Sequence, residues 1–149
     1  MKSEYLSFLE NCKNILGETE GVRFEEIECI ESLFNIKLPF AYIEYLLQFG
    51  RKSGNLLGSY LTEINNLDKN KESAKVASVD ELDGVQVPIE DSYFFFGQWQ
   101  GYIFYFFDCE EDCENPPVYI LTDSPKIEKY KDSFSEFIRD EGLKPLLGL

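Results

Sequence analysis

Residues 94–108, with the sequence FFFGQWQGYIFYFFD, decide the fold class of this chain. They contain two runs rich in Phe and Tyr, separated by the polar segment GQWQG and followed by an acid. Aromatic side chains favour pleated strands, and two glycines this close together interrupt a helix. The pattern therefore predicts two β-strands, at about residues 93–96 and 102–107, joined as a hairpin through residues 97–101.

The sequence before this hairpin is typical of helices. Apolar residues recur every three or four positions in residues 3–16, 23–34 and 39–49, which predicts three helices with one buried face each. Pro39 suits the start of the third helix because its missing N–H needs no partner there, and Gly50 suits the end. The predicted buried residues are Tyr5, Phe8, Leu9, Cys12, Ile15 and Leu16 in the first helix, Phe24, Ile27, Ile30, Leu33 and Phe34 in the second, and Tyr42, Tyr45, Leu46 and Phe49 in the third.

The remaining segments complete an α+β pattern. We expect a short strand at residues 56–61, one helix within residues 62–84, an edge segment at 85–89 and a strand at 118–121. Ser133 and Glu136 form a capping-box pattern that opens a last helix, with Phe134, Phe137 and Ile138 turned inward. Residues 1–149 are therefore predicted to form a single α+β domain. Its sheet, of about four to six mostly antiparallel or mixed strands, would be flanked by the N-terminal helices and the C-terminal helix.

The composition limits the possible partners. The 149 residues include 14 basic and 28 acidic side chains, so the formal net charge is −14. Phosphates repel such a chain, which argues against binding to nucleic acid or to an anionic membrane and favours a basic protein partner. The alternative is that the acids serve solubility alone. We see no secretory signal and no apolar run of membrane-spanning length, so we expect a cytoplasmic protein whose four cysteines are free thiols.

The sequence argues against an enzyme. It contains no histidine, which removes the commonest general base and metal ligand, and it has no glycine-rich phosphate loop. A hydrolase built on two carboxylates stays open as an alternative, although 28 acids make chance pairs inevitable. We expect no catalytic residues and no cofactor.

Residues 108–117, DCEEDCENPP, form a predicted acidic loop. Cys109 and Cys113 are spaced too widely for a zinc knuckle, although they could pair under oxidation. The alternating acids resemble a calcium loop, but the central glycine is missing and the twelfth residue is Tyr119 instead of Glu. We therefore expect no metal, and a solvated loop is the simplest interpretation.

Trp99 is the only tryptophan, and it lies between two glutamines at the predicted turn. Its side chain either folds back onto the domain or anchors a partner. If it is exposed, it could form one interaction face with the acidic loop. The candidate partner-binding residues are Trp99, Asp108, Glu110, Glu111, Asp112 and Glu114.

Four segments together resemble the SUKH superfamily of Smi/Knr-like domains. Residues 27–50, IECIESLFNIKLPFAYIEYLLQFG, are similar to the family's opening helices around a Leu-Pro pair, and residues 96–108 are similar to its hairpin ending in Asp. The Pro-Val-Tyr strand at 117–119 and the Ser-Phe-x-x-Phe-Ile helix at 133–138 follow in the family's order, so the resemblance spans about residues 20–140. The chain departs from the family at its hairpin turn, where Gln98, Trp99 and Gln100 replace the usual Asp, Asn or Gly.

This resemblance implies a function. Many bacterial SUKH proteins are immunity proteins that bind and block a toxin, often a nuclease, made by the same cell. The hypothesis is therefore capture of a basic toxin by shape and charge. The alternative is a regulatory or scaffold module that binds a cell-wall or signalling protein. The sequence predicts neither the identity of the toxin nor the oligomeric state.

Overall fold

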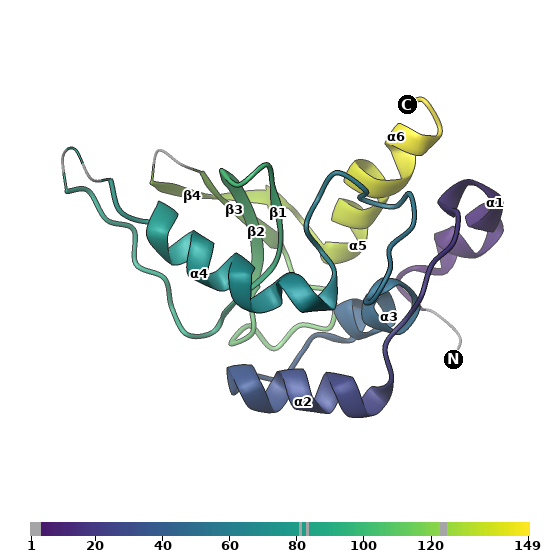
Figure 1. Cartoon of the computed structure of the whole chain (residues 1–149), viewed down its shortest axis with the longest axis horizontal. Helices are drawn as coiled ribbons and strands as arrows, with labels where there is room; N and C mark the ends of the chain where they lie inside the picture. The colour runs from purple at the N-terminus through teal and green to yellow at the C-terminus, as the bar shows by residue number, and fades with distance from the viewer. Residues whose placement is uncertain (1–3, 81, 83, 123–124) are drawn as a thin grey trace.

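The computed structural model describes residues 4–80, 82, 84–122 and 125–149 (Figure 1). Residue 3, at the start of the first predicted helix, and residues 81 and 83, within the predicted 62–84 segment, lie outside them. The described residues contain a four-stranded antiparallel sheet in the order β1-β2-β3-β4. The strands are β1 (Tyr93–Trp99), β2 (Ile103–Asp108), β3 (Val118–Thr122) and β4 (Lys126–Lys131). The prediction of a single α+β domain with an antiparallel sheet flanked by helices is confirmed in its fold class.

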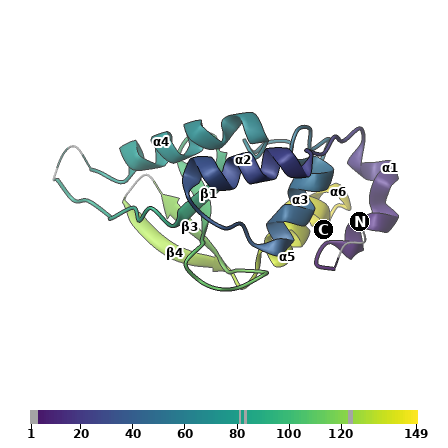
Figure 2. The same ribbon diagram turned by 90° about the horizontal axis from the view of Figure 1, so that it is seen from below.

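Helices cover both faces of the sheet. On one face, Phe94, Phe96 and Phe107 pack with residues of α3 (Phe40–Phe49) and α5 (Phe134–Phe137). On the other face, Phe95 and Phe106 pack against α4 (Leu67–Ala77). Figures 1 and 2 show α4 and the pair α3 and α5 on opposite sides of the strands. Because successive side chains of a strand point to opposite faces, an aromatic run without alternation is what a strand buried on both faces requires.

The hairpin is longer than the sequence pattern predicted. β1 continues to Trp99, and the turn is formed by Gln100 and Gly101, whose φ angles are 51° and 78°. Positive φ at both central residues gives a turn whose twist matches that of the strands. Gln98, predicted in the turn, is a buried strand residue with 3% exposure.

Gly97 allows a second segment to approach β1. The register shifts between Phe95 and Gly97, and a Cβ at Gly97 would lie 2.9 Å from Thr62 Cγ2. The Leu61 N–H donates a hydrogen bond to the Gln98 carbonyl oxygen at 2.9 Å. The segment around Thr62 therefore covers the edge of β1 that faces away from β2.

Residues 56–61, predicted as a strand, form turns at 56–59, and only Tyr60 among them makes a β-bridge, to Trp99. Leu56 and Leu57 are both buried, with 0% and 3% exposure, and Leu57 has a φ of 55°. The two leucines fill the core beneath the C-terminal helical segment, where a Cβ at Gly142 would lie only 2.7 Å from Leu56 Cδ1. The apolar pair thus reflects packing of an irregular segment and not a strand.

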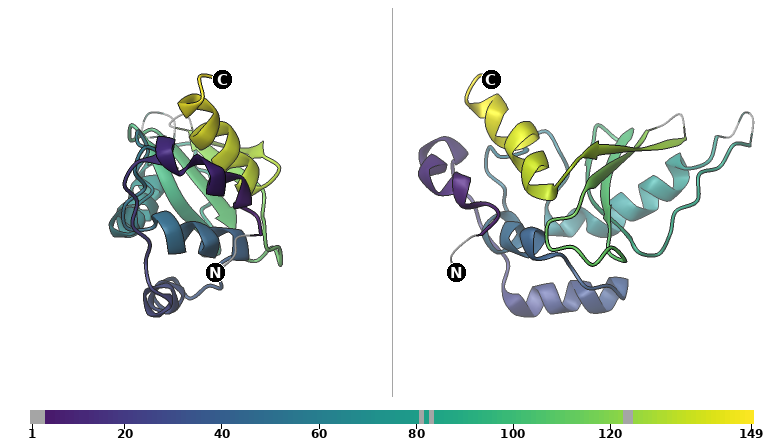
Figure 3. Two further views of the ribbon diagram at one scale, coloured as in Figure 1. Left: turned by 90° about the vertical axis from the view of Figure 1, so that its right-hand side faces the viewer. Right: turned by 180° about the vertical axis from the view of Figure 1, so that it is seen from behind.

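The N-terminal helices differ in regularity. The first begins as the 3-10 helix η1 (Ser7–Cys12) and ends as α1 (Lys13–Leu16), whereas α2 (Phe24–Phe34) is close to the predicted 23–34. Ile27 and Ile30 are buried as predicted, but Phe24 and Leu33 are 57% and 69% exposed. α2 lies at the outer edge of the molecule in Figures 1 and 3, so only one side of it has a core to contact. The short helix η2 (Ile64–Asn66) leads into α4.

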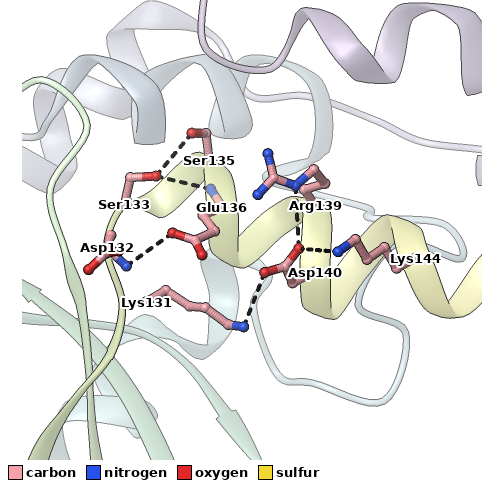
Figure 4. A network of polar contacts seen from close by, with 8 residues as sticks. All are labelled: Lys131, Asp132, Ser133, Ser135, Glu136, Arg139, Asp140 and Lys144. Carbon is pink, nitrogen blue, oxygen red and sulfur yellow. Dashed lines mark hydrogen bonds and ion pairs between the residues drawn. The ribbon is translucent and has the colours of Figure 1, made fainter. Parts of the chain in front are cut away.

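The C-terminal segment begins with the predicted Ser133 cap, but the reciprocal contact of a capping box is shifted by one residue, to the N–H of Asp132 instead of Ser133. The Ser133 hydroxyl accepts a hydrogen bond from the Glu136 N–H, and the Glu136 carboxylate accepts one from the Asp132 N–H (Figure 4). Phe134, Phe137 and Ile138 are fully buried, as predicted. α5 continues into a π-helical stretch, η3 (Ile138–Leu143), and then α6 (Lys144–Leu146).

Asp140 joins this segment to β4. Its carboxylate contacts the side chains of Lys131, Arg139 and Lys144 at 3.1, 3.3 and 3.1 Å (Figure 4). Burial alone would raise the pKa of Asp140, but hydrogen bonds from the three cations outweigh it and lower the pKa to about 2. The carboxylate is therefore held ionised at the junction of sheet and helix.

Candidate protein-binding site

The acidic loop, residues 109–117 between β2 and β3, is attached to two helix N-termini. The Glu114 carbonyl oxygen accepts a hydrogen bond from the Ala41 N–H of α3 at 2.8 Å. Asn115 pairs with Ser135 at the start of α5: its Oδ1 accepts from the Ser135 N–H at 2.9 Å, and its Nδ2 donates to the Ser135 hydroxyl at 2.8 Å. The first N–H groups of a helix have no partner within the helix, so these contacts satisfy donors that would otherwise need water.

Shorter contacts shape the loop itself. Asp108 Oδ1 accepts a hydrogen bond from the Glu110 N–H at 3.0 Å, which turns the chain at the end of β2. The Tyr119 hydroxyl donates to the Glu111 carboxylate at 3.2 Å, and the Tyr5 hydroxyl donates to the Glu114 carboxylate at 2.7 Å. The loop is therefore held by its backbone, by the side chain of Asp108 at the end of β2, and by two of its own four carboxylates.

The negative charge of the loop is not neutralised. None of the ion pairs formed within the described ranges involves a loop carboxylate. The carboxylates of Glu110 and Asp112 are exposed and have no hydrogen-bond or ion-pair partner among the described residues. The Glu114 hydrogen bond raises the pKa of Tyr5 to about 12, and burial, followed by the charge of Glu111, raises the pKa of Tyr119. Both tyrosines therefore stay protonated at neutral pH and can donate their hydrogen bonds to the loop.

Two grooves adjoin the loop. The larger, of about 640 Å³, lies between the C-terminal end of α2, α4 and the start of β1. The smaller, of about 380 Å³, lies between the loop and the start of α3. Lys37, Cys109 and Glu110 line both, so the grooves form one continuous depression. Its other ionisable side chains are Asp68, Lys71, Glu72, Lys75 and Asp91 in the larger groove and Glu111, Asp112, Cys113 and Glu114 in the smaller.

The ionisable groups inside the larger groove have structural roles. Burial raises the pKa of the Cys109 thiol to about 12, so this cysteine stays protonated and is a poor nucleophile. Lys71 donates from Nζ to the backbone carbonyl of Tyr93 at 2.8 Å and to those of Asp91 and Glu90 at 3.3 and 3.5 Å. Burial lowers the pKa of Lys71. Lys71 thus fixes the chain entering β1, and its three carbonyl acceptors give this lysine a structural role.

Trp99 lies apart from the acidic loop. It pairs with Ile103 at the turn end of the hairpin, whereas Asp108 pairs with Tyr93 at the other end. Five residues of strand separate the two ends, which corresponds to about 17 Å. Trp99 is partly buried against the core and packs edge-to-face on Tyr102 with ring centroids 5.4 Å apart. The structure therefore places Trp99 and the acidic loop at opposite ends of the hairpin, whereas Asp108, Glu110, Glu111, Asp112 and Glu114 lie together at one end.

Sequence reasoning missed the wall that α2 contributes to the depression. Leu33, Phe34, Ile36 and Lys37 line the larger groove, although the sequence pattern assigned Leu33 to the core. Asn35 adopts the left-handed conformation with φ 52° and ends α2, which turns the chain toward Pro39. An Asn directly before the Leu-Pro pair is a signal that could have predicted this turn.

Two classes of site are not seen in the part of the chain that the structure describes. Within it, no group of three or more His, Cys, Asp or Glu side chains is placed to hold a metal ion. None of its helices is long and apolar enough to cross a membrane.

The fold and the site define a single α+β domain that presents an anchored acidic loop beside a depression. Comparison with known protein families identifies the family of this domain. The SUKH family model described as SMI1-KNR4 cell-wall matches residues 24–138, and the chain belongs to this family. The match begins at the first residue of α2 and ends within the C-terminal helical segment, so it includes the loop, all four strands and both grooves. No curated protein matches the chain.

Proposed function

We propose that this chain is an immunity protein that binds a basic cognate toxin, such as a nuclease, and blocks it by steric and electrostatic capture in the cytoplasm. The observation that carries the proposal is the acidic loop, which is fixed by its backbone while the carboxylates of Glu110 and Asp112 have no partner among the described residues. Membership of the SUKH family is consistent with this function.

Charge and rigidity support such capture for separate reasons. A nuclease needs a basic cleft to hold phosphates, and a chain with a net charge of −14 is attracted to that cleft over a distance. Unpaired carboxylates interact with the partner without first breaking ion pairs of their own. A loop already fixed on α3 and α5 loses little conformational entropy when it binds. We therefore expect fast, salt-dependent association and inhibition without chemistry.

One alternative has an observation in its favour. The matching family model carries the description cell-wall, which agrees with a regulatory or scaffold module that binds a cell-wall or signalling protein. The same acidic surface would then recognise a basic host protein without inhibiting a toxin. Recovery of a nontoxic housekeeping protein as the specific partner would favour this alternative.

The test begins with a pull-down from the native cell lysate at low and at high salt. The basic protein recovered is then purified, assayed for toxicity, and measured for binding to wild type and to the triple variant Glu110→Gln, Glu111→Gln, Asp112→Asn. Removing three loop charges should lower the association rate constant about tenfold at low salt and flatten its salt dependence. The control variant Glu10→Gln, Glu25→Gln, Glu28→Gln changes the net charge equally at three exposed acids that do not line the depression and form no ion pair among the described residues. It should retain most of the wild-type association rate constant.

Gln at position 111 keeps a side-chain oxygen that accepts the Tyr119 hydrogen bond. Glu114 stays unchanged because its shorter contact with Tyr5 and its backbone contact with α3 both hold the loop. A loop variant that associates as fast as wild type would remove the loop from the binding site. A partner that is toxic in cells but not neutralised by the wild-type chain would refute the immunity function itself.

A further inference from the structure

A narrow arm, formed by the described residues 78–80, 82 and 84–89, projects from the end of α4 beyond the sheet. Figures 1, 2 and 3 all show it at one extreme of the molecule, away from the C-terminus. The arm is closed by three backbone hydrogen bonds: Asp80 N–H to Val85 O at 2.7 Å, Gly84 N–H to Asp80 O at 2.9 Å, and Val87 N–H to Ser78 O at 2.9 Å. A bridge also pairs Val79 with Gln86. It is therefore a hairpin-like element with its own internal contacts.

The arm and the adjoining end of α4 expose apolar side chains. Leu82 is 98% exposed, Val76 74%, Val85 50% and Val79 40%. The tip of a solvated hairpin has no need of a leucine, because polar turn residues form such tips readily. Several large apolar side chains clustered at the surface are typical of a protein contact, where an aliphatic anchor fills a pocket on the partner.

The charges around the arm restrict the kind of partner. Residues 76–91 contain five acids and no lysine or arginine. The five are Asp80, Glu81, Asp83, Glu90 and Asp91, of which Glu81 and Asp83 lie outside the described residues. Leu82 is therefore flanked in sequence by two carboxylates. A pocket that accepts it must be apolar in its centre and basic at its border.

We propose that the arm anchors a basic partner protein by inserting Leu82 into an apolar pocket bordered by Lys or Arg side chains. Resting on the proposed function, this makes the arm a second contact with the toxin. α4 carries the arm and also forms one wall of the larger groove through Asp68, Lys71, Glu72 and Lys75. The loop raises the association rate constant and recognises the partner's charge. The arm adds burial of apolar surface, which salt does not weaken. A second copy of the chain fits the arm less well, because two chains of −14 repel each other.

The test compares Leu82→Ser with Leu149→Ser, which makes the same change at a leucine that is 81% exposed at the C-terminus. Both variants and the wild-type chain are titrated with the purified basic partner and with poly-L-lysine, a probe that binds through charge alone. Burial of one leucine side chain is large enough for Leu82→Ser to weaken binding to the partner about tenfold, mainly through faster dissociation. Leu149→Ser should bind the partner within about twofold of wild type, and all three chains should bind poly-L-lysine equally.

The outcomes separate this proposal from the immunity function. If Leu82→Ser binds the partner as tightly as wild type while the wild-type chain still neutralises toxicity, the arm proposal falls and the immunity function stands. A basic partner that depends on Leu82 but is not toxic supports the arm and overturns immunity. If wild type retains no basic protein, both proposals fail. Sedimentation that shows a wild-type dimer converted to monomer by Leu82→Ser would assign the arm to self-association and overturn the proposal.

Discussion

For two tyrosines on α3, replacement by Phe is predicted to change the free energy of unfolding in opposite directions. Tyr42 and Tyr45 are buried to 0% and 1% exposure and stack with ring centroids 6.1 Å apart. The Tyr45 hydroxyl forms a buried hydrogen bond with Thr62 Oγ1 at 2.9 Å. The Tyr42 hydroxyl has no partner among the described residues. Replacing either by Phe removes one oxygen and leaves the ring in place, so the two variants isolate the effect of the hydroxyl.

The magnitudes follow from the cost of burying polar groups. An unpaired buried hydroxyl costs about 1–3 kcal/mol, so Tyr42→Phe should leave the free energy of unfolding unchanged or raise it by about 1 kcal/mol. Tyr45→Phe breaks a hydrogen bond and leaves Thr62 Oγ1 without a partner. This change should lower the free energy of unfolding by about 1–3 kcal/mol. The two variants should thus differ by at least about 1 kcal/mol.

Urea unfolding followed by tyrosine and tryptophan fluorescence measures both variants. With a slope of about 1–3 kcal/mol per molar urea, Tyr45→Phe should move the midpoint down by about 1 M and Tyr42→Phe should leave it in place or move it up. In the double variant Tyr45→Phe, Thr62→Val both partners are gone, so stability should partly recover. A Tyr42→Phe variant that loses 1 kcal/mol or more would refute the reasoning, because its hydroxyl would then have a stabilising partner such as a buried water.

Two further predictions concern polar contacts between elements. Asn70, fully buried on α4, accepts from Gln98 Nε2 at 2.7 Å and donates to the Leu61 carbonyl at 2.9 Å, so Asn70→Ala should destabilise by about 2–4 kcal/mol in urea unfolding. Asn65→Ala, at an exposed position, should cost under 0.5 kcal/mol, and equal effects would contradict this assignment. Asp140, with its pKa lowered to about 2, stabilises the folded state fully above its ordinary pKa of 3.8 and loses that contribution as pH falls through 2. The contribution is about 1–2 kcal/mol after solvent screening, so Asp140→Asn should be less stable than wild type by this amount at pH 6 and about equally stable at pH 2. A difference in stability that is the same at both pH values would contradict the ion-pair cause.

The fold class was predictable because its strongest signals are local. The Phe and Tyr runs identified β1 and β2, and Pro39 and Ser133 marked helix starts that the structure places within one residue. β4 was missed because KIEKYK is polar on an edge strand, where lysines protect the exposed backbone instead of reporting burial. The strand predicted at residues 56–61 rested on Leu56 and Leu57. Two adjacent leucines fit a strand pattern, but they are equally well buried in an irregular turn.

The candidate site was predictable only in part. The loop acids were identified from charge alone. The sequence did not show the separation of Trp99 from the loop, which arises because a hairpin carries its turn away from its ends. The depression depends on the distance between α2, α4 and the loop, and no local pattern encodes such a distance. The exposure of Leu33 arises in the same way, since α2 has a partner on one side only.

The attachment of the acidic loop has a consequence for how this protein can diverge. The contacts that hold the loop on α3 and α5 use the carbonyl of residue 114 and the side chain of Asn115. The side chains at positions 110 and 112 take no part in them. Mutations there change what the loop presents while its placement and the stability of the domain stay nearly constant. A lineage could therefore follow a changing partner one surface residue at a time, without crossing unstable intermediates.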